Sequence, residues 1–145
     1  MGESLIRIFR LLHKTPNFKL LNLTLMQKRF DLSDRLIDFA SDCIDVAGRL
    51  PGTFAGNHIA EQFVRSSTSP ALHYGEAQAA GSSNDFIHKM KVCLKELRET
   101  FNCLRLIKKK CWFDEEKLSA LIAENNELIA IFVASIKTAH KNRLR

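Results

Sequence analysis

The spacing of the apolar residues is the feature that most constrains the fold of this chain. They recur at steps of three and four over long segments, and those segments lack the strict alternation of a β-strand. Such steps place side chains on one face of an α-helix. The 145 residues include only three prolines and six glycines, so little in the sequence interrupts helices. We therefore expect an all-α protein, and the length suits one domain with a buried core.

Turn sequences divide this pattern into four helices. Leu50-Pro51-Gly52 ends the first helix, Gly81-Ser82-Ser83 follows the second, and Asp114 begins the last. We expect helices over about 31–48, 57–79, 82–110 and 114–140. Four helices joined by short turns favour an antiparallel up-down four-helix bundle. Its predicted core consists of Leu36, Phe39, Leu97, Phe101, Leu104, Ile122, Ile129 and Phe132.

The N-terminal segment differs from the rest of the chain in its charge. The formal net charge of the whole chain is +6, and residues 1–30 alone carry six Lys or Arg against one Glu. We therefore divide the chain into a basic arm, residues 1–28, and the bundle, residues 29–145. Three roles remain open for the amphipathic start of the arm: contact with a membrane or nucleic acid, packing on the bundle, or a leader upstream of a start at Met26. No run approaches the roughly 20 uncharged apolar residues of a membrane span, so we expect no membrane partner.

The cysteines and histidines do not form a recognisable metal or catalytic motif. The four cysteines contain no CxxC pair, and without a convincing secretion signal we expect reduced thiols in a cytoplasmic protein. The pairs His58/Glu61 and His73/Glu76 lie on one predicted helix, about 22 Å apart at ~1.5 Å per residue. Motifs for activated nucleophiles and phosphate-binding loops are missing from the sequence. We therefore expect no metal, no cofactor and no catalytic residue.

One face of the first predicted helix is acidic. Its aspartates recur at steps of three and four, at Asp34, Asp38, Asp42 and Asp45. One helix face cannot surround a divalent cation with the six to eight or so oxygens that calcium takes. Two interpretations remain, a solvated face and a contact in an oligomer. For the second interpretation, these four aspartates are the candidate oligomer-interface residues.

The third predicted helix and the end of the chain are basic. The candidate nucleic-acid-binding residues are Lys91, Lys95, Arg98, Arg105, Lys108, Lys109, Lys110, Lys141 and Arg143. Such a surface would follow phosphates, and Trp112 and Phe113 would be available to stack on bases. The alternatives are a solvated face whose last lysines complement the helix dipole, or a contact with the acidic first helix of a neighbouring copy.

Several motifs taken together resemble a known family. They are Leu50-Pro51-Gly52-Thr53, Arg65-Ser66-Ser67-Thr68-Ser69, Tyr74-Gly75-Glu76-Ala77, Asp85-Phe86-Ile87-His88-Lys89, Leu94-Lys95-Glu96-Leu97-Arg98-Glu99-Thr100 and the stretch from Glu127 to Ala139. Over about residues 29–142 the chain resembles the bacterial four helix bundle proteins. These include proteins encoded within intervening sequences of large-subunit ribosomal RNA genes. The resemblance implies an up-down four-helix bundle that assembles into a homopentameric ring.

The resemblance also implies a kind of partner. Related members accompany the reverse transcriptases of diversity-generating retroelements, where a basic ring surface is thought to hold nucleic acid and the enzyme. No catalytic residue carries over, since the family has none established. The chain departs from the family at His73, where Asn is usual, and at Gly75, where a basic residue is common. Both changes weaken an anion site at that position, and the arm is a further departure.

Two functions are compatible with these features. The first is a non-enzymatic, ring-forming scaffold or accessory protein that binds RNA, DNA or a nucleic-acid enzyme such as a reverse transcriptase. The second is a structural bundle that binds proteins and has no nucleic-acid role. The basic third helix and the resemblance favour the first function, whereas the nearly neutral charge of residues 31–145 favours the second.

Overall fold

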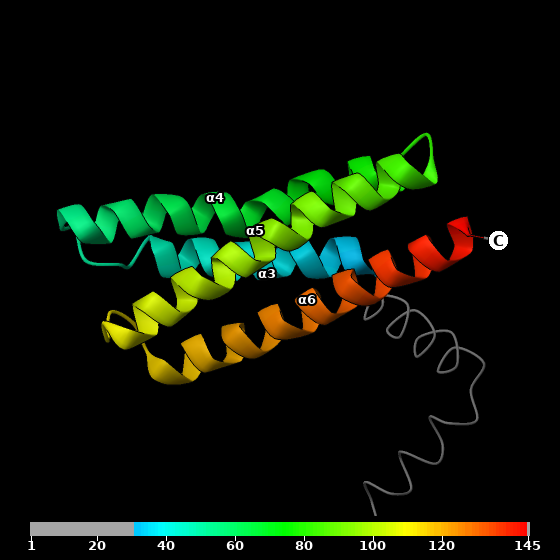
Figure 1. Ribbon diagram of the computed structural model, residues 1–145. Helices are drawn as coiled ribbons and strands as arrows, with labels where there is room; N and C mark the ends of the chain where they lie inside the picture. Colours follow the sequence, from blue (N-terminus) through cyan, green and yellow to red (C-terminus); the bar gives the residue numbers. More distant parts are fainter. Residues whose placement is uncertain (1–30, 145) are drawn as a thin grey trace, which may run out of the picture. The chain divides into compact units, whose positions relative to one another are not determined.

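Four helices make up the described part of the chain, which is residues 31–144 of a computed structural model. They are α3 (Leu32–Ala47), α4 (Phe54–Gln78), α5 (Ser83–Lys109) and α6 (Glu115–Arg143). Successive helices run in opposite directions (Figure 1), and no strand occurs within residues 31–144. The predicted all-α, antiparallel four-helix bundle is therefore confirmed. The predicted basic arm, residues 1–28, lies outside the described residues.

Side-chain caps fix where the four helices begin, and Asp31 caps α3 by accepting hydrogen bonds from the Ser33 and Asp34 amides. The other three helices begin in the same way. In each case the residue before the helix accepts a hydrogen bond from an amide of the first turn, and these residues are Thr53, Ser82 and Asp114. Such caps satisfy amides that have no partner within the helix. We expected α4 to begin near residue 57, but the Thr53 cap starts it earlier, at Phe54. Gly56 makes this early start possible, because a Cβ there would lie 1.9 Å from the Pro51 carbonyl oxygen.

Helix α5 ends in a Schellman motif. The Trp112 N–H donates to the Ile107 carbonyl at 3.2 Å, and the Cys111 N–H donates to the Lys108 carbonyl at 3.0 Å. Cys111 takes a φ of 54°, in the left-handed region that favours glycine. A side chain in this region costs about 1–2 kcal/mol. The motif turns the chain sharply, so that α6 returns alongside α5 (Figure 1).

The core is apolar and receives side chains from all four helices. Five of the eight predicted core residues are buried, namely Leu36, Phe39, Leu97, Leu104 and Phe132. The other three, Phe101, Ile122 and Ile129, are only half-buried, so their prediction as core residues was wrong. The pattern therefore identified the correct helix faces but not the centre of each face.

The physical reason for the error is visible on α5 and α6. The Phe101 ring lies at the edge of the core, with the Arg105 guanidinium 5.6 Å from its centroid. The buried residues of α6 are Leu118, Leu121, Asn125, Leu128, Phe132 and Ile136. Ile122 and Ile129 each follow a buried leucine, so they lie beside this stripe rather than on it. Asn125 takes a core position that an apolar pattern does not predict.

Four polar side chains lie buried inside the bundle, namely Ser66, Ser67, Thr100 and Asn125. The hydroxyls of Thr100 and Ser66 are hydrogen-bonded at 3.0 Å, which joins α5 to α4. The Asn125 Nδ2 donates to the Leu97 carbonyl at 3.1 Å, which joins α6 to α5. Its Oδ1 has no hydrogen-bond partner among the described residues. Because a buried polar group is costly when it loses its partner, these contacts favour one register of the helices.

Three of the four cysteines are buried thiols. Burial raises the pKa of the Cys43 thiol to about 12 and that of Cys93 to about 11. Burial also raises the pKa of Cys103. A thiol with a raised pKa stays protonated at neutral pH and reacts slowly. These three side chains therefore act as core residues, whereas Cys111 is exposed.

Helix α6 is the one helix within residues 31–144 that is long and apolar enough, by length and composition, to cross a membrane. Core helices of bundles satisfy the same criterion. In this bundle Leu118, Leu128 and Phe132 of α6 are fully buried against the other helices. Of the apolar stretch that meets this criterion, 28% is buried within the bundle, so packing in the core accounts for part of the composition of α6.

Candidate nucleic-acid interface

Helix α5 has two sides with different charges, and its α4 side is neutralised within the bundle. Arg65 of α4 forms ion pairs with Glu96, at 3.1 Å, and with Glu99. The hydrogen bond to Glu99 and the charge of Glu96 raise the pKa of the Arg65 guanidinium. Gln62 also accepts a hydrogen bond from Arg65. The glutamates of α5 are thus paired with a cation on the neighbouring helix.

The α6 side of α5 is basic and lines an open groove of about 630 Å³. The basic residues of this groove are Lys91, Lys95 and Arg98 of α5 with Lys137 and His140 of α6. Its floor is aliphatic and consists of Leu94, Val133 and Ile136. No carboxylate lines the groove, and within residues 31–144 none of its Lys or Arg side chains forms an ion pair. We call this the basic groove.

The structure thus brings together three of the predicted nucleic-acid-binding residues, Lys91, Lys95 and Arg98. They lie at steps of four and three, so they share one face of α5. Lys137 and His140 were missed by the sequence analysis. Together with Val133 they also follow steps of four and three, but only the packing of α6 on α5 shows that this face meets the basic side of α5.

The other predicted nucleic-acid-binding residues of α5 lie near its C-terminal end. The Arg105 guanidinium lies 5.6 Å from the Phe101 ring centroid, and the Lys110 Nζ lies 6.0 Å from the Trp112 centroid. Lys109 is exposed. We call Arg105, Lys109 and Lys110 the basic end of α5. Two of its three cations, Arg105 and Lys110, lie beside aromatic rings, which is the combination that binds single-stranded nucleic acid.

Three other predicted residues are in different situations. Lys108 forms an ion pair with Glu115 at 3.3 Å and donates to the Ser119 hydroxyl, so its charge is partly neutralised. Arg143 donates to the Asn84 Oδ1 at 2.7 Å, which links the end of α6 to the start of α5. Lys141 is exposed at the end of α6. It follows Lys137 and His140, which line the basic groove.

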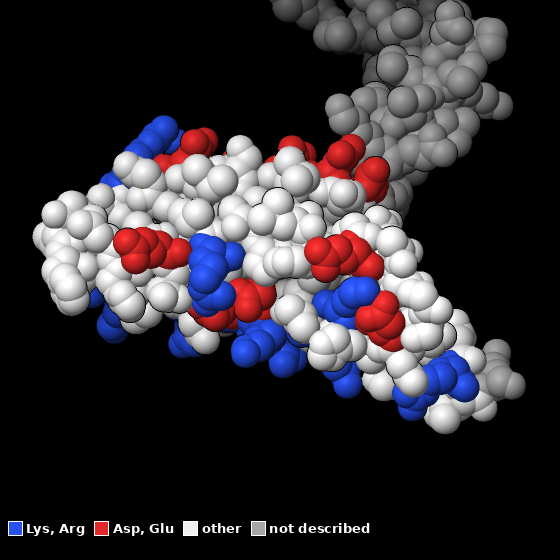
Figure 2. Space-filling model, turned by 90° about the horizontal axis from the view of Figure 1, so that it is seen from above, with Lys and Arg blue, Asp and Glu red and all other residues white. Residues whose placement is uncertain are grey.

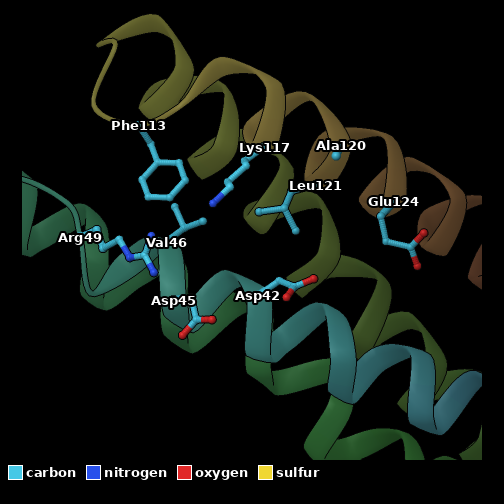
Figure 3. A pocket seen from close by; sticks show the side chains of 9 residues that line it. All are labelled: Asp42, Asp45, Val46, Arg49, Phe113, Lys117, Ala120, Leu121 and Glu124. Carbon is cyan, nitrogen blue, oxygen red and sulfur yellow. The ribbon is translucent and has the colours of Figure 1, made fainter.

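The four predicted aspartates are all exposed on α3. Asp42 and Asp45 line a second groove, of about 450 Å³, between α3 and α6. Figure 3 shows Phe113 at one end of this groove, with Arg49 and Lys117 below it, and Asp42 and Glu124 toward the other end. This groove therefore contains charges of both signs. We call it the mixed groove.

The distribution of charge over the surface follows the same division. Figure 2 shows Lys and Arg side chains gathered along one edge of the bundle, and Asp and Glu side chains prevailing along the opposite edge. The basic edge belongs to the α5 side and the acidic edge to α3. Among the described residues, no three His, Cys, Asp or Glu side chains lie close enough to hold a metal ion.

Comparison with known sequences places this bundle in a family. Residues 28–134 match the family described as 23S rRNA-intervening sequence protein. The chain belongs to this family. The match includes α3, α4, α5 and most of α6, and it confirms the resemblance found in the sequence. No curated protein sequence gives a significant match.

A solved structure supports the same assignment. It is a crystal structure of a protein with unknown function from the S23 ribosomal protein family from Bacteroides thetaiotaomicron, and it shares 27% sequence identity with this chain. The alignment covers 72% of this chain and 97% of that chain, with a TM-score of 0.67. The intervening sequence protein fold therefore spans the four helices described above.

The family match ends at residue 134, so it includes some of the candidate residues and leaves out others. Those on α5, from Lys91 to Lys110, lie inside the part of the chain that matches the intervening sequence proteins. Lys137, His140, Lys141 and Arg143 lie beyond residue 134, where the match ends. The α5 half of the basic groove thus belongs to the family region, whereas both basic residues of the α6 half, Lys137 and His140, follow it.

Proposed function

We propose that this intervening sequence protein is a self-assembling accessory protein of the bacterial cytoplasm, which acts by binding nucleic acid or a nucleic-acid enzyme rather than by catalysis. The observation that carries the proposal is the unneutralised row of cations along the α6 side of α5. It begins with Lys91, Lys95 and Arg98 and continues at the basic end of α5. Cations without internal partners are stabilised by external anions, and phosphates are the anions that release counterions when they bind.

Self-assembly is supported by the separation of opposite charges on the bundle. The acidic edge on α3 and the basic edge on α5 attract one another between copies (Figure 2). A contact between two different surfaces is heterologous, and when the rotation between copies closes, it forms a ring. A ring repeats the basic end of α5 once per copy. Such repetition turns a moderate patch into a strong site for a polyanion.

The test of polyanion binding is its dependence on salt. With about five phosphates neutralised, the affinity for single-stranded RNA should fall roughly 100-fold between about 50 and about 200 mM salt. We expect similar affinities for RNA and DNA of several sequences, because phosphate contacts carry no sequence information. Fluorescence anisotropy with labelled oligonucleotides measures both. Lack of binding at low salt would contradict the nucleic-acid part of the proposal.

A matched pair of variants locates the site. Lys109→Gln/Lys110→Gln removes two cations from the basic end of α5, and it should reduce the salt slope by about 1.4. Arg49→Gln/Lys117→Gln removes two cations from the mixed groove, where carboxylates lie nearby. That control should bind RNA almost as the original chain does. Equal losses in the two variants would show that net charge, rather than this site, governs binding.

A protein partner without any nucleic acid is the second candidate function. The observation that favours it is the exposure of large apolar side chains on α4, where Phe54 is 92% exposed and Leu72 is 69% exposed. Exposed apolar side chains are typical of protein contacts when they form a patch. If the protein assembles but binds neither RNA nor DNA at low salt, this second function is supported.

A further inference from the structure

The basic groove has features that suit a helix better than a nucleic acid. Its floor consists of Leu94, Val133 and Ile136, and no Phe, Tyr or Trp side chain lies among its lining residues. Proteins that bind single strands combine cations with aromatic rings on which bases stack. An aliphatic floor between two helices, with charged rims, instead resembles the grooves that accept an amphipathic helix. The sign of the rims requires that helix to be acidic.

The chain itself presents such a helix on its opposite edge. Ile37 and Ile44 of α3 are 52% and 48% exposed, and they lie seven residues apart on one face. Asp38 and Asp45 follow these isoleucines directly and are exposed beside them. We call these four residues the acidic ridge. An exposed pair of isoleucines between carboxylates offers apolar contact and negative charge together.

We infer that the basic groove of one copy receives the acidic ridge of a second copy. This inference rests on the self-assembly proposed above and specifies the two surfaces that carry it. Ile37 and Ile44 would pack on the aliphatic floor, while Asp38 and Asp45 face the cations of the rims. Both surfaces present apolar side chains, and their charges are opposite. The phosphates of a nucleic acid would match the charge of the basic groove but not its aliphatic floor.

The positions of the two surfaces determine the type of assembly. The acidic edge and the basic edge lie on opposite sides of the bundle (Figure 2), so two copies cannot exchange both contacts at once. Each copy therefore uses its ridge on one neighbour and its groove on another. Such head-to-tail contacts form a closed ring or an open chain of copies.

The inference also divides the basic side of α5 between two partners. In the assembled protein the cations Lys91, Lys95 and Arg98 are neutralised by the neighbouring ridge. The basic end of α5, with Arg105, Lys109 and Lys110, remains available for phosphates. Assembly and polyanion binding are then carried by different residues of the same helix, and substitutions should separate them.

Charge reversal on either surface tests the contact. Asp38→Lys/Asp45→Lys makes the ridge basic, and Lys95→Asp/Arg98→Asp makes part of the groove acidic. Each variant brings like charges together, so its mass by light scattering at low salt should fall to that of one copy, 16.5 kDa. All substituted residues are exposed, and circular dichroism confirms that the helices are retained. A variant that is folded and still fully assembled overturns the inference.

The chain with all four substitutions provides the rescue. Its ridge is basic and its groove is acidic at positions 95 and 98, so the contacts at these positions are complementary again, and the net charge equals that of the original chain. We expect the original mass to return, and RNA binding through the basic end of α5 to persist. A four-substitution chain that is folded but monomeric overturns the inference, even when the original chain assembles. An original chain that is itself monomeric instead refutes the proposed self-assembly.

Discussion

The two sides of helix α5 differ in how their charges are balanced. On the α4 side, Glu96 and Glu99 are paired with Arg65, and a buried hydrogen bond joins Thr100 to Ser66. On the α6 side, Lys91, Lys95 and Arg98 line a groove that contains no carboxylate. The charges on the α4 side are paired within the bundle, so they require no external partner. The unbalanced side lowers its free energy when an anionic surface covers it, and this is why we propose that the α6 side recruits partners.

The largest expected effect on stability comes from a core residue of α5, between its α4 side and its α6 side. Leu97 is fully buried, and its carbonyl accepts the hydrogen bond of Asn125. Leu97→Ala should lower the free energy of unfolding by roughly 2–5 kcal/mol, because it leaves a cavity in the core. The matched control is Leu106→Ala, since Leu106 lies on the same helix and is 50% exposed. Its effect should stay within about 0.5 kcal/mol. Chemical denaturation measures both, and equal losses would contradict the assigned core.

The next effect tests the polar contact on the α4 side. Thr100→Val keeps the size of the side chain and removes the hydroxyl that bonds to Ser66. We expect a loss of about 1 kcal/mol in the free energy of unfolding, because a buried hydrogen bond is removed. Thr138→Val on the exposed surface of α6 is the control and should be nearly neutral. A stabilised Thr100→Val variant would show that this buried contact does not favour the native packing.

A smaller effect of opposite sign is expected where α5 ends. Cys111 has a φ of 54°, which a glycine adopts without strain. Cys111→Gly should therefore raise the free energy of unfolding by about 0.5–1 kcal/mol, after the entropy cost of glycine is subtracted. Cys111→Ala keeps a Cβ and should give no such gain. If both variants were equally stabilised, the thiol rather than the backbone conformation would be the cause.

The smallest expected change in stability comes from a pair of variants that compares the α4 side of α5 directly with its α6 side. Arg65→Gln breaks the ion pairs with Glu96 and Glu99, but Arg65 is exposed, so the loss should be less than about 1 kcal/mol. Lys95→Gln breaks no ion pair within residues 31–144 and should leave the unfolding transition unchanged. It should instead raise the protein concentration at which half of the copies are assembled, and Arg65→Gln should not. Light scattering over a dilution series measures this midpoint, and identical midpoints would remove the distinction between the sides.

Much of the fold could be predicted from the sequence because helix periodicity and turn residues are local signals. The caps at Ser82 and Asp114 and the core positions Leu36, Phe39 and Leu97 follow from residues close together in the chain. The early start of α4 at Phe54 could not be predicted in this way. It depends on the Thr53 cap and on the close approach of Gly56 to the Pro51 carbonyl, and both are properties of a folded turn.

The candidate site was predicted only in part for a similar reason. The row Lys91, Lys95 and Arg98 is visible in the sequence because its members share one helix. Their meeting with Lys137 and His140, about forty residues later in the chain, requires α6 to pack against α5. Likewise, the sequence treated Lys108 as equivalent to Lys109. Only the return of the chain brings Glu115 within 3.3 Å of the Lys108 Nζ and separates the two lysines.

The sequence by itself therefore determined the fold class, the number of helices within residues 31–144 and the opposite charges of α3 and α5. These properties depend on residue type and on spacing along one helix, where neighbours are fixed by covalent geometry. The tertiary structure decided which residues form the centre of the core, which cations are neutralised and where the grooves lie. Those properties depend on contacts between helices, and small rotations of each helix about its axis decide them.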